Sequence, residues 1–221
     1  MDWRTWHDRY ELPESGLARR LQVVQQQIRT VLDNSPSGAL QVISLCAGQG
    51  RDLLGVLANH PRRRDVRARL VELDARNTAV AEEAAGAARL PGVEVVTADA
   101  SLTDHYRDVV PADLVLVCGV FGNITDEDIE RTVGVCAQLC RTGGTVIWTR
   151  HRGAPDRVPL ICKWFEERGF ERRWLSEPNV DFGVGVHRFT RQPQQLALGT
   201  RMFTFVGYDV LRDAKTQARH A

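Results

Sequence analysis

The sequence predicts an α/β fold in which a mainly parallel β-sheet carries helices on both faces. Apolar strand-like runs alternate with helix-like segments between residues 41 and 149, and this alternation is typical of parallel sheets. Two further strand-like runs, 170–175 and 183–189, follow one another without a helix between them. Because so short a link fits only a hairpin, an antiparallel strand is expected at the end of the sheet.

Composition and charge exclude some functions. The chain has 221 residues, 43% of them hydrophobic and 26% charged, which is ordinary for a globular protein, and no linker-like stretch divides it, so one domain over 1–221 is expected. Lys and Arg number 29 against 28 Asp and Glu, so bulk nucleic acid is a disfavoured partner. No apolar signal core or membrane-spanning run occurs, so we expect a cytoplasmic protein without membrane association. The oligomeric state stays open.

The five cysteines are odd in number and show no C-x-x-C spacing. They are Cys46, Cys118, Cys136, Cys140 and Cys162. We expect buried free thiols, with no disulfide and no zinc site.

The first part of the chain, 1–36, is predicted to form a helical cap in two pieces divided by Pro13. Ser15 is placed to begin the second piece. Aromatic side chains share one face of the first piece. They are Trp3, Trp6 and Tyr10, together with His7. This face either packs on the core or contacts a substrate, in which case Trp6 and Tyr10 are the predicted contacts.

The elements that follow are predicted from apolar periodicity. Strands are expected at 41–45, 67–73, 93–97, 113–118 and 144–149, and helices at 51–59, 75–89, 102–109, 126–141 and about 155–168. The strand 113–118 is apolar on both faces and therefore belongs in the middle of the sheet. In the C-terminal extension, 191–221, the apolar run 200–208 is an extra edge strand or a flap, and 212–221 is a solvated or frayed helix.

A turn of small residues follows the first strand. Gly48 and Gly50 leave its backbone bare, so a ligand can lie against it beside the N-terminus of the next helix. A dinucleotide fingerprint would require glycine or alanine where Leu53 stands, so that ligand class is disfavoured. The run of the second strand ends in the carboxylate of Asp74, which lies 24 residues after Gly50, about where a ribose-binding acid is found in such folds.

These motifs together resemble the class I S-adenosylmethionine-dependent methyltransferases. Gly48 and Gly50 match the family's first motif, whereas Ser44 replaces its usual acid and Cys46 its first glycine. The run 141–144 resembles the glycine pair before the family's fifth strand. The resemblance spans roughly 40–190, a Rossmann-like core. It implies a three-layer α/β/α sandwich whose seven-stranded sheet is mostly parallel, with a last antiparallel strand.

The resemblance also implies the cofactor site. It assigns cofactor contacts to Cys46, Ala47, Gly48, Gly50, Asp52, Asp74, Asp99, Ala100 and Gly119. Asp74 would accept hydrogen bonds from the ribose hydroxyls, the alternative being a helix cap. Asp99 and Ala100 would contact the adenine, and Gly119 the methionine amino group. Asp52 either supplies what Ser44 cannot or has a structural role in the first turn of its helix.

Methyl transfer from a sulfonium mainly requires alignment of donor and acceptor, plus a base if the acceptor carries a proton to be removed. His151, just past the fifth strand, is the predicted catalytic base, the alternative being an ordinary surface histidine; His187 is the weaker candidate. The residues 119–123 lack the Asn-Pro-Pro-Tyr and Pro-Cys motifs of nucleobase enzymes, and the ends of strands four and five lack acids for magnesium. A metal-independent enzyme acting on a small molecule is therefore expected. The alternatives are an RNA- or protein-modifying methyltransferase and an inactive cofactor-binding module.

Overall fold

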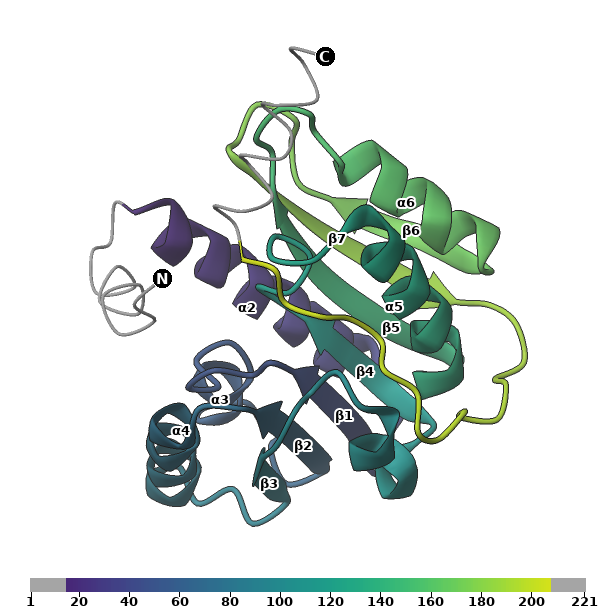
Figure 1. The fold of residues 1–221 in the computed structure, drawn as a ribbon. Coiled ribbons are helices and arrows are strands. Elements are labelled where there is room, and N and C mark those ends of the chain that lie inside the picture. The colour runs from purple at the N-terminus through teal and green to yellow at the C-terminus, as the bar shows by residue number, and fades with distance from the viewer. Residues whose placement is uncertain (1–14, 208–221) are drawn as a thin grey trace.

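A computed structural model describes residues 15–207, and its elements follow the predicted order (Figure 1). The strands are β1 (Leu40–Leu45), β2 (Val66–Glu72), β3 (Val93–Thr97), β4 (Ala112–Val117), β5 (Cys140–His151), β6 (Phe170–Leu175) and β7 (Phe182–Phe189). The helices are α2 (Gly16–Asn34), α3 (Leu53–Leu57), α4 (Ala75–Ala87), the 3-10 helix η2 (Thr103–Val109), α5 (Asp126–Leu139) and α6 (Val158–Glu167). The aromatic face of residues 1–14, with Trp3, Trp6, His7 and Tyr10, and the predicted helix 212–221 lie outside the described residues.

The seven strands form one sheet in the order β3-β2-β1-β4-β5-β7-β6. The pairs from β3 to β5 are all parallel, and β7 is antiparallel to both β5 and β6. The antiparallel strand and the central place of the strand at 112–117 are therefore confirmed. After β1, the strands β2 and β3 are added on one side of it, and β4 is added on its other side. The order of the strands therefore reverses between β1 and β4, which is a topological switch point. Open α/β sheets bind ligands at the carboxyl ends of such strands.

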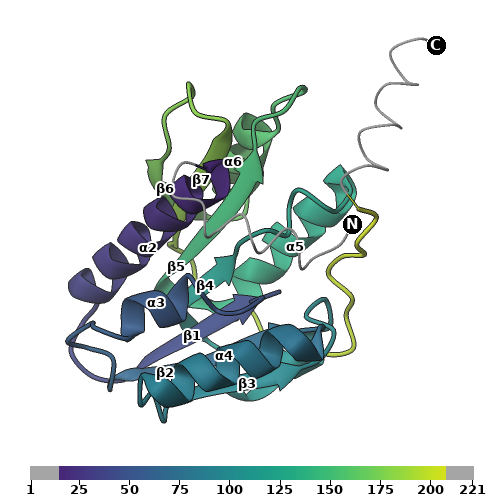
Figure 2. The ribbon, with the colours of Figure 1, turned by 90° about the vertical axis from the view of Figure 1, so that its left-hand side faces the viewer.

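Each face of the sheet buries its own core, which gives the three-layer sandwich that was predicted. Figure 2 shows α2, α3 and α4 on one face and α5 with α6 on the other. Along β1 the side chains alternate, as a strand requires: Val42 belongs to the core beneath α2 and α3, whereas Ile43 and Leu45 belong to the core beneath α5 and α6.

The helix α2 begins at a side-chain cap. Ser15 Oγ accepts a hydrogen bond from Ala18 N at 3.0 Å, which satisfies one of the unpaired N–H groups of the first turn. The helix buries Val24, Ile28 and Leu32 and contacts α3, β5 and β7. This part of the predicted cap therefore lies in one of the two helical layers, with its first turns near the carboxyl edge of β1.

Two elements differ in detail from their expected form. The helix was expected to end at 141 and the fifth strand to begin at 144, whereas α5 ends at Leu139 and β5 starts at Cys140. Gly143 has a φ of +83°, and a Cβ on Gly144 would lie 2.6 Å from Ala112 O. The glycine pair thus allows β5 to approach β4 where their register shifts between Ala112 and Leu114. The helix expected at 102–109 is present as the 3-10 helix η2.

The segment 197–207, here called the C-terminal strap, is not the edge strand that was one of its two predicted forms. Its only ladder pairing among the described residues is an isolated bridge between Leu102 and Arg201. It runs beside α5 toward the carboxyl edge of the sheet, in yellow in Figure 1. Hydrogen bonds join it to the region before η2 and to α5.

The cysteine prediction is confirmed in part. All five cysteines are free, and Cys136, Cys140 and Cys162 are buried, whereas Cys46 and Cys118 are half-buried. Among residues 15–207, no helix has both the length and the apolar character needed to cross a membrane.

Candidate functional site

A cavity of about 440 Å³ opens at the carboxyl ends of β1 and β4, at the switch point. Its lining brings together segments that are far apart in the sequence. Predicted site residues in the lining are Cys46, Ala47, Gly48, Asp52, Asp74, Asp99, Ala100 and Gly119. Residues that the sequence did not single out for the site are Arg20, Leu21, Val24, Leu45, Gln49, Arg51, Glu72, Leu73, Asn77, Thr149, Phe203 and Phe205; Ser44 and Cys118 complete the lining.

The turn after β1 contains three residues in the left-handed region. The φ angles are 49° at Cys46, 56° at Gly48 and 68° at Gly50. Such a conformation is costly for Cys46, which has a Cβ. Burial raises the pKa of the Cys46 thiol, and the nearby charges of Glu72 and Asp99 raise it further. A raised pKa favours the protonated thiol, which is a poor nucleophile.

Gly50 is buried and is not among the residues that line the cavity, so its role as a cofactor contact stays a prediction. A Cβ at this position would lie 2.7 Å from Leu54 Cδ1 and 2.9 Å from Leu70 Cδ2. The absence of a side chain allows α3 to pack closely on β2, and the φ of +68° favours glycine as well.

The carboxylate that ends β2 is Glu72, not Asp74. Its Oε2 accepts a hydrogen bond from Gly48 N at 2.9 Å, and its Oε1 accepts one from Asp74 N at 3.0 Å. Two N–H donors therefore hold the carboxylate over the glycine turn, in the cavity wall.

Asp74 lies beyond the strand and caps α4, which was the alternative weighed for it. One oxygen, Oδ1, accepts from Arg76 N at 2.9 Å, and Oδ2 pairs with Arg76 Nη2 at 2.6 Å. The expectation that Asp74 ends the strand is wrong, because the pairing of β2 stops at Glu72. Asp74 still borders the cavity, but its carboxylate is engaged by its own helix.

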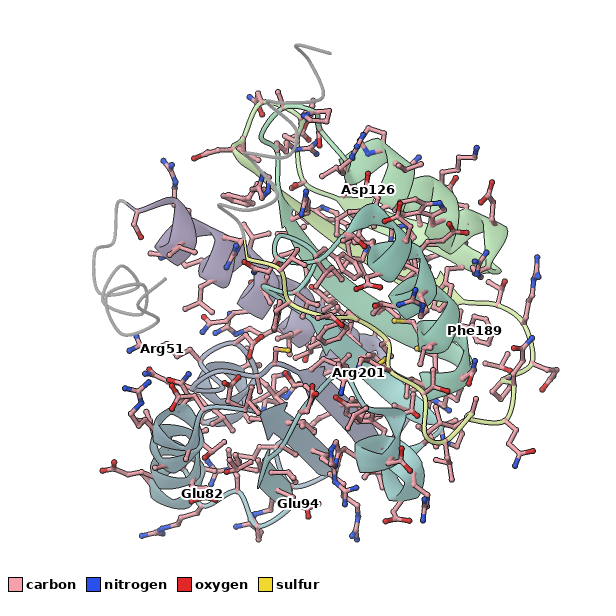
Figure 3. All side chains as sticks on the ribbon, in the orientation of Figure 1. Arg51, Glu82, Glu94, Asp126, Phe189 and Arg201 are labelled. Carbon is pink, nitrogen blue, oxygen red and sulfur yellow. The ribbon has the colours of Figure 1, made fainter. Side chains whose placement is uncertain are left out.

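Asp99 and Ala100 follow β3 and reach the cavity as predicted. Asp99 Oδ1 accepts from Ser101 N at 3.0 Å, and Oδ2 accepts from Arg201 Nη1, on the strap, at 2.7 Å. Arg201 is labelled in Figure 3. Burial by itself raises the pKa of Asp99, but the hydrogen bonds from Ser101 and Arg201 outweigh it, so the pKa lies below its ordinary value. The carboxylate is therefore charged at neutral pH.

Asp52 is a second carboxylate in the cavity wall, at the N-terminus of α3. Its Oδ1 accepts from Leu53 N at 2.7 Å, so the structural role is present. Burial raises the pKa of Asp52, although hydrogen bonds from the backbone, the charge of Arg20 and the Cys118 thiol act in the opposite direction. A positively charged ligand group beside this carboxylate would offset the cost of its burial.

Gly119 lies in the bare backbone beyond β4. Its φ is +79°, and nothing lies within 4 Å of the position that a Cβ would take. Its N–H donates to Thr149 Oγ1 at 2.9 Å, and its carbonyl accepts from Asn123 Nδ2 at 2.8 Å. These bonds fix the loop, while the second lone pair of the carbonyl oxygen remains available to a ligand.

The two candidate histidines lie in different surroundings. His151 is the last residue of β5 and is not among the residues that line the cavity. Its Nδ1 accepts from Gly153 N at 3.0 Å, so the neutral ring carries its proton on Nε2. His187 is fully buried, and burial together with the charge of Arg172 lowers its pKa to about 3. His187 therefore lies in the core, bonded to Trp148 Nε1, and its candidacy as a base is wrong; the role of His151 stays a prediction.

The residues that sequence reasoning missed fall into two classes. Glu72 had a local signal: it is a carboxylate at the end of an apolar run, two residues before a helix cap. Phe203 and Phe205 had none, since only the path of the strap brings them to the cavity. Among the described residues, no group of three or more His, Cys, Asp or Glu side chains is arranged to hold a metal ion.

Solved structures that share this fold include several methyltransferases. CurJ carbon methyltransferase has a TM-score of 0.66 at 16% identity, covering 83% of this chain and 58% of its own. Magnesium protoporphyrin IX methyltransferase from Synechocystis PCC 6803, with bound SAM, has a TM-score of 0.60 at 13% identity over 77% and 80% of the two chains. An O-methyltransferase family protein from Burkholderia thailandensis has a TM-score of 0.58 at 16% identity over 85% and 69%. The sequence matches no protein-family model and no curated protein, and at these identities the likeness to solved structures shows a shared fold.

Proposed function

We propose that this chain, which has the class I methyltransferase fold, transfers a methyl group from S-adenosylmethionine to a small-molecule acceptor without a metal ion. One observation carries the proposal. At the switch point of the sheet, a single cavity gathers the glycine turn of β1, the carboxylate of Glu72 and the Asp99-Ala100 pair. These are the groups that a nucleoside joined to an amino acid requires.

The adenosine half fits the side of the cavity formed by β2 and β3. Glu72 accepts one backbone hydrogen bond at each oxygen, and each oxygen keeps a lone pair with which to accept from a ribose hydroxyl. Leu73 is 68% exposed in the same wall and offers an apolar surface to the adenine ring. Asp99 would accept from the exocyclic amine, and Ala100 N would donate to the ring.

The methionine half fits the side formed by α3 and the loop after β4. Ser44, which replaces the family's usual acid, is only 2% exposed and carries no charge. Asp52 supplies a carboxylate to the same cavity, so it would pair with the ammonium group, together with the Gly119 carbonyl. In this proposal, Asp52 at the start of α3 takes the place of the acid that the family usually has at the position of Ser44.

The protein's contribution to the reaction would be alignment and exclusion of water. When bound, S-adenosylmethionine would supply a methyl group activated by its sulfonium. The acceptor would form a bond to the methyl carbon in line with the S–CH3 bond, which would break with S-adenosylhomocysteine as the leaving group. Leu21 and Val24 of α2 and Phe203 and Phe205 of the strap give the cavity apolar walls, which keep water from the reacting atoms. Trp6 and Tyr10 remain predicted acceptor contacts, and His151 the predicted base.

The other acceptor classes are weaker candidates. A net charge of +1 gives no support to RNA as the acceptor. An inactive cofactor-binding module stays open because of Ser44 and Cys46. Cys118 and Gly119, which follow β4, and Thr149, within β5, line the cavity without a carboxylate. They are poor ligands for magnesium, which supports a metal-independent reaction. A cytosolic location stays a prediction.

Calorimetric titration with S-adenosylhomocysteine tests the cofactor site, and saturable binding to one site is expected. No binding at millimolar concentration, in protein that melts cooperatively, would contradict the proposal. A screen of small molecules, RNA and peptides with methyl-labelled cofactor then separates the alternatives. Label in a small molecule supports the proposal, label in RNA or peptide supports the second class, and binding without transfer supports the inactive module.

A further inference from the structure

The C-terminal strap is held in place along its length by hydrogen bonds to three other segments. They connect it to the residues after β3, to the loop after β4 and to α5. The bonds are Thr103 N to Thr200 O at 3.0 Å, Met202 N to Ser101 O at 2.8 Å, Thr204 N to Asp128 Oδ2 at 2.8 Å and Val206 N to Asn123 O at 2.9 Å. The strap thus has one defined path across the edge of the sheet where the cavity opens.

The strap joins the core to the cavity. Met202 is fully buried and Phe203 is 2% exposed, both in the core beneath α5. Phe205 is 43% exposed, its ring centroid lies 5.5 Å from that of Phe203, and both rings line the cavity. A shift of the strap would therefore move one wall of the site.

Arg201 connects the strap to the cofactor side of the cavity. Its Nη1 donates to Asp99 Oδ2 at 2.7 Å and to Ser101 Oγ at 2.8 Å. The other Asp99 oxygen accepts from Ser101 N, so both carboxylate oxygens are held and the side chain has one orientation. Arg201 and Asp99 are 102 residues apart in the sequence, and their pairing is a tertiary contact between the strap and the loop after β3.

We propose that Arg201 is a positioning residue, which holds Asp99 in the orientation that meets the adenine and thereby links cofactor binding to the order of the strap. The inference rests on the proposed function. A carboxylate that is already oriented loses less side-chain freedom when the ligand binds. Because such coupling is reciprocal, the bound cofactor stabilises the strap, and with it the wall formed by Phe203 and Phe205.

Competition between Arg201 and the adenine for Asp99 would have the opposite effect on binding. Each carboxylate oxygen has about two lone-pair sites. Oδ2 uses one for Arg201 and Oδ1 uses one for Ser101 N, so an acceptor site remains for the exocyclic amine. Orientation therefore outweighs competition, and the loss of Arg201 weakens binding.

The first test compares Arg201→Met with Arg168→Met by titration with S-adenosylhomocysteine. Arg168 is a matched control, since its Nη2 lies 3.0 Å from Glu130 Oε1 and the two side chains are 37% and 44% exposed, against 51% and 37% for Arg201 and Asp99. Arg201→Met should weaken binding about three- to tenfold, the order expected for one partly exposed charged pair. Arg168→Met should leave affinity unchanged, and Arg201→Lys should restore part of the loss.

The second test distinguishes positioning from a merely structural role. Amide hydrogen exchange of Met202, Thr204 and Val206 is measured with and without S-adenosylhomocysteine. In the wild-type protein the ligand should slow the exchange of these amides about three- to tenfold. Because the coupling is reciprocal, this factor should equal the loss of affinity expected for Arg201→Met in the first test. In Arg201→Met this protection should be lost, although ligand is present at saturating concentration.

Two results overturn the inference. One is equal affinity of the wild-type protein and Arg201→Met; the other is strap exchange that does not respond to the ligand in the wild-type protein. Should Arg201→Met fail to fold, the inference is tested by the affinity of Arg201→Lys and by the exchange of the strap amides in the wild-type protein. Failure of the folded wild-type protein to bind S-adenosylhomocysteine would instead overturn the proposed function, and this inference with it.

Discussion

Glu72 Oε2 accepts a hydrogen bond from Gly48 N at 2.9 Å, which ties the end of β2 to the glycine turn of β1. The bond fixes the position of the carboxylate and closes the turn at the same time. The two neighbouring strands thus present one charged group and one stretch of bare backbone to the same ligand.

Glu72→Gln should weaken binding of S-adenosylhomocysteine by about 1.5–3 kcal/mol, the range for hydrogen bonds to a charged group. Asp74→Asn is the matched control, because asparagine also caps helices well, and its affinity should be nearly unchanged. Calorimetry measures both variants. Loss of affinity in Asp74→Asn with none in Glu72→Gln would show that the ribose lies against Asp74, as the sequence first indicated.

Gly50→Ala should destabilise the fold by about 2–4 kcal/mol, since it adds overpacking to the cost of a left-handed φ. The added Cβ would meet Leu54 Cδ1 at 2.7 Å. Gly199→Ala is the control: Gly199 has the same φ of +68° but no atom within 4 Å of its Cβ position, so only about 1–2 kcal/mol should be lost. Urea unfolding measures both. An equal cost would mean that the backbone conformation, and not the contact with α3, requires the glycine.

The fully buried His187 should make the protein less stable in acid. Burial and the charge of Arg172 lower its folded-state pKa from 6.5 to about 3, so below about pH 6.5 the unfolded chain takes up a proton that the folded chain does not. The contribution of His187 to the free energy of unfolding should therefore fall by about 1.4 kcal/mol per pH unit as the pH drops from about 6 toward 3. In His187→Gln, which can still accept from Trp148 Nε1, unfolding free energies between pH 7 and pH 4.5 should decline less steeply. Parallel curves for the two proteins would contradict the assignment.

Most of the fold could be predicted because its signals are local. Apolar runs and their periods predicted the order of strands and helices, and the short link between the two last strands predicted the antiparallel β7. The glycine turn and the Asp99-Ala100 pair follow strands directly, so a correct strand end places each of them at the edge of the sheet. These inferences needed no knowledge of which segments touch.

The choice between Glu72 and Asp74 could not be made in this way. The two residues are two positions apart and would lie on the same face of an extended strand, so alternation does not separate them. What separates them is where β2 stops pairing with β3, at Glu72, and where α4 begins, at Ala75. Element ends depend on neighbouring strands and caps, and they shift by a residue or two without changing the local pattern.

The sequence by itself determined the layers of this protein, the direction of its strands and the edge of the sheet that carries the site. Tertiary structure alone decided which side chains complete that site: Phe203 and Phe205 reach it on a strap without regular structure, and Leu21 reaches it from α2. The physical reason is the range of the interactions. Periodicity and turn chemistry act over a few residues, whereas the pairing of Arg201 with Asp99 across 102 residues exists only once the chain has folded.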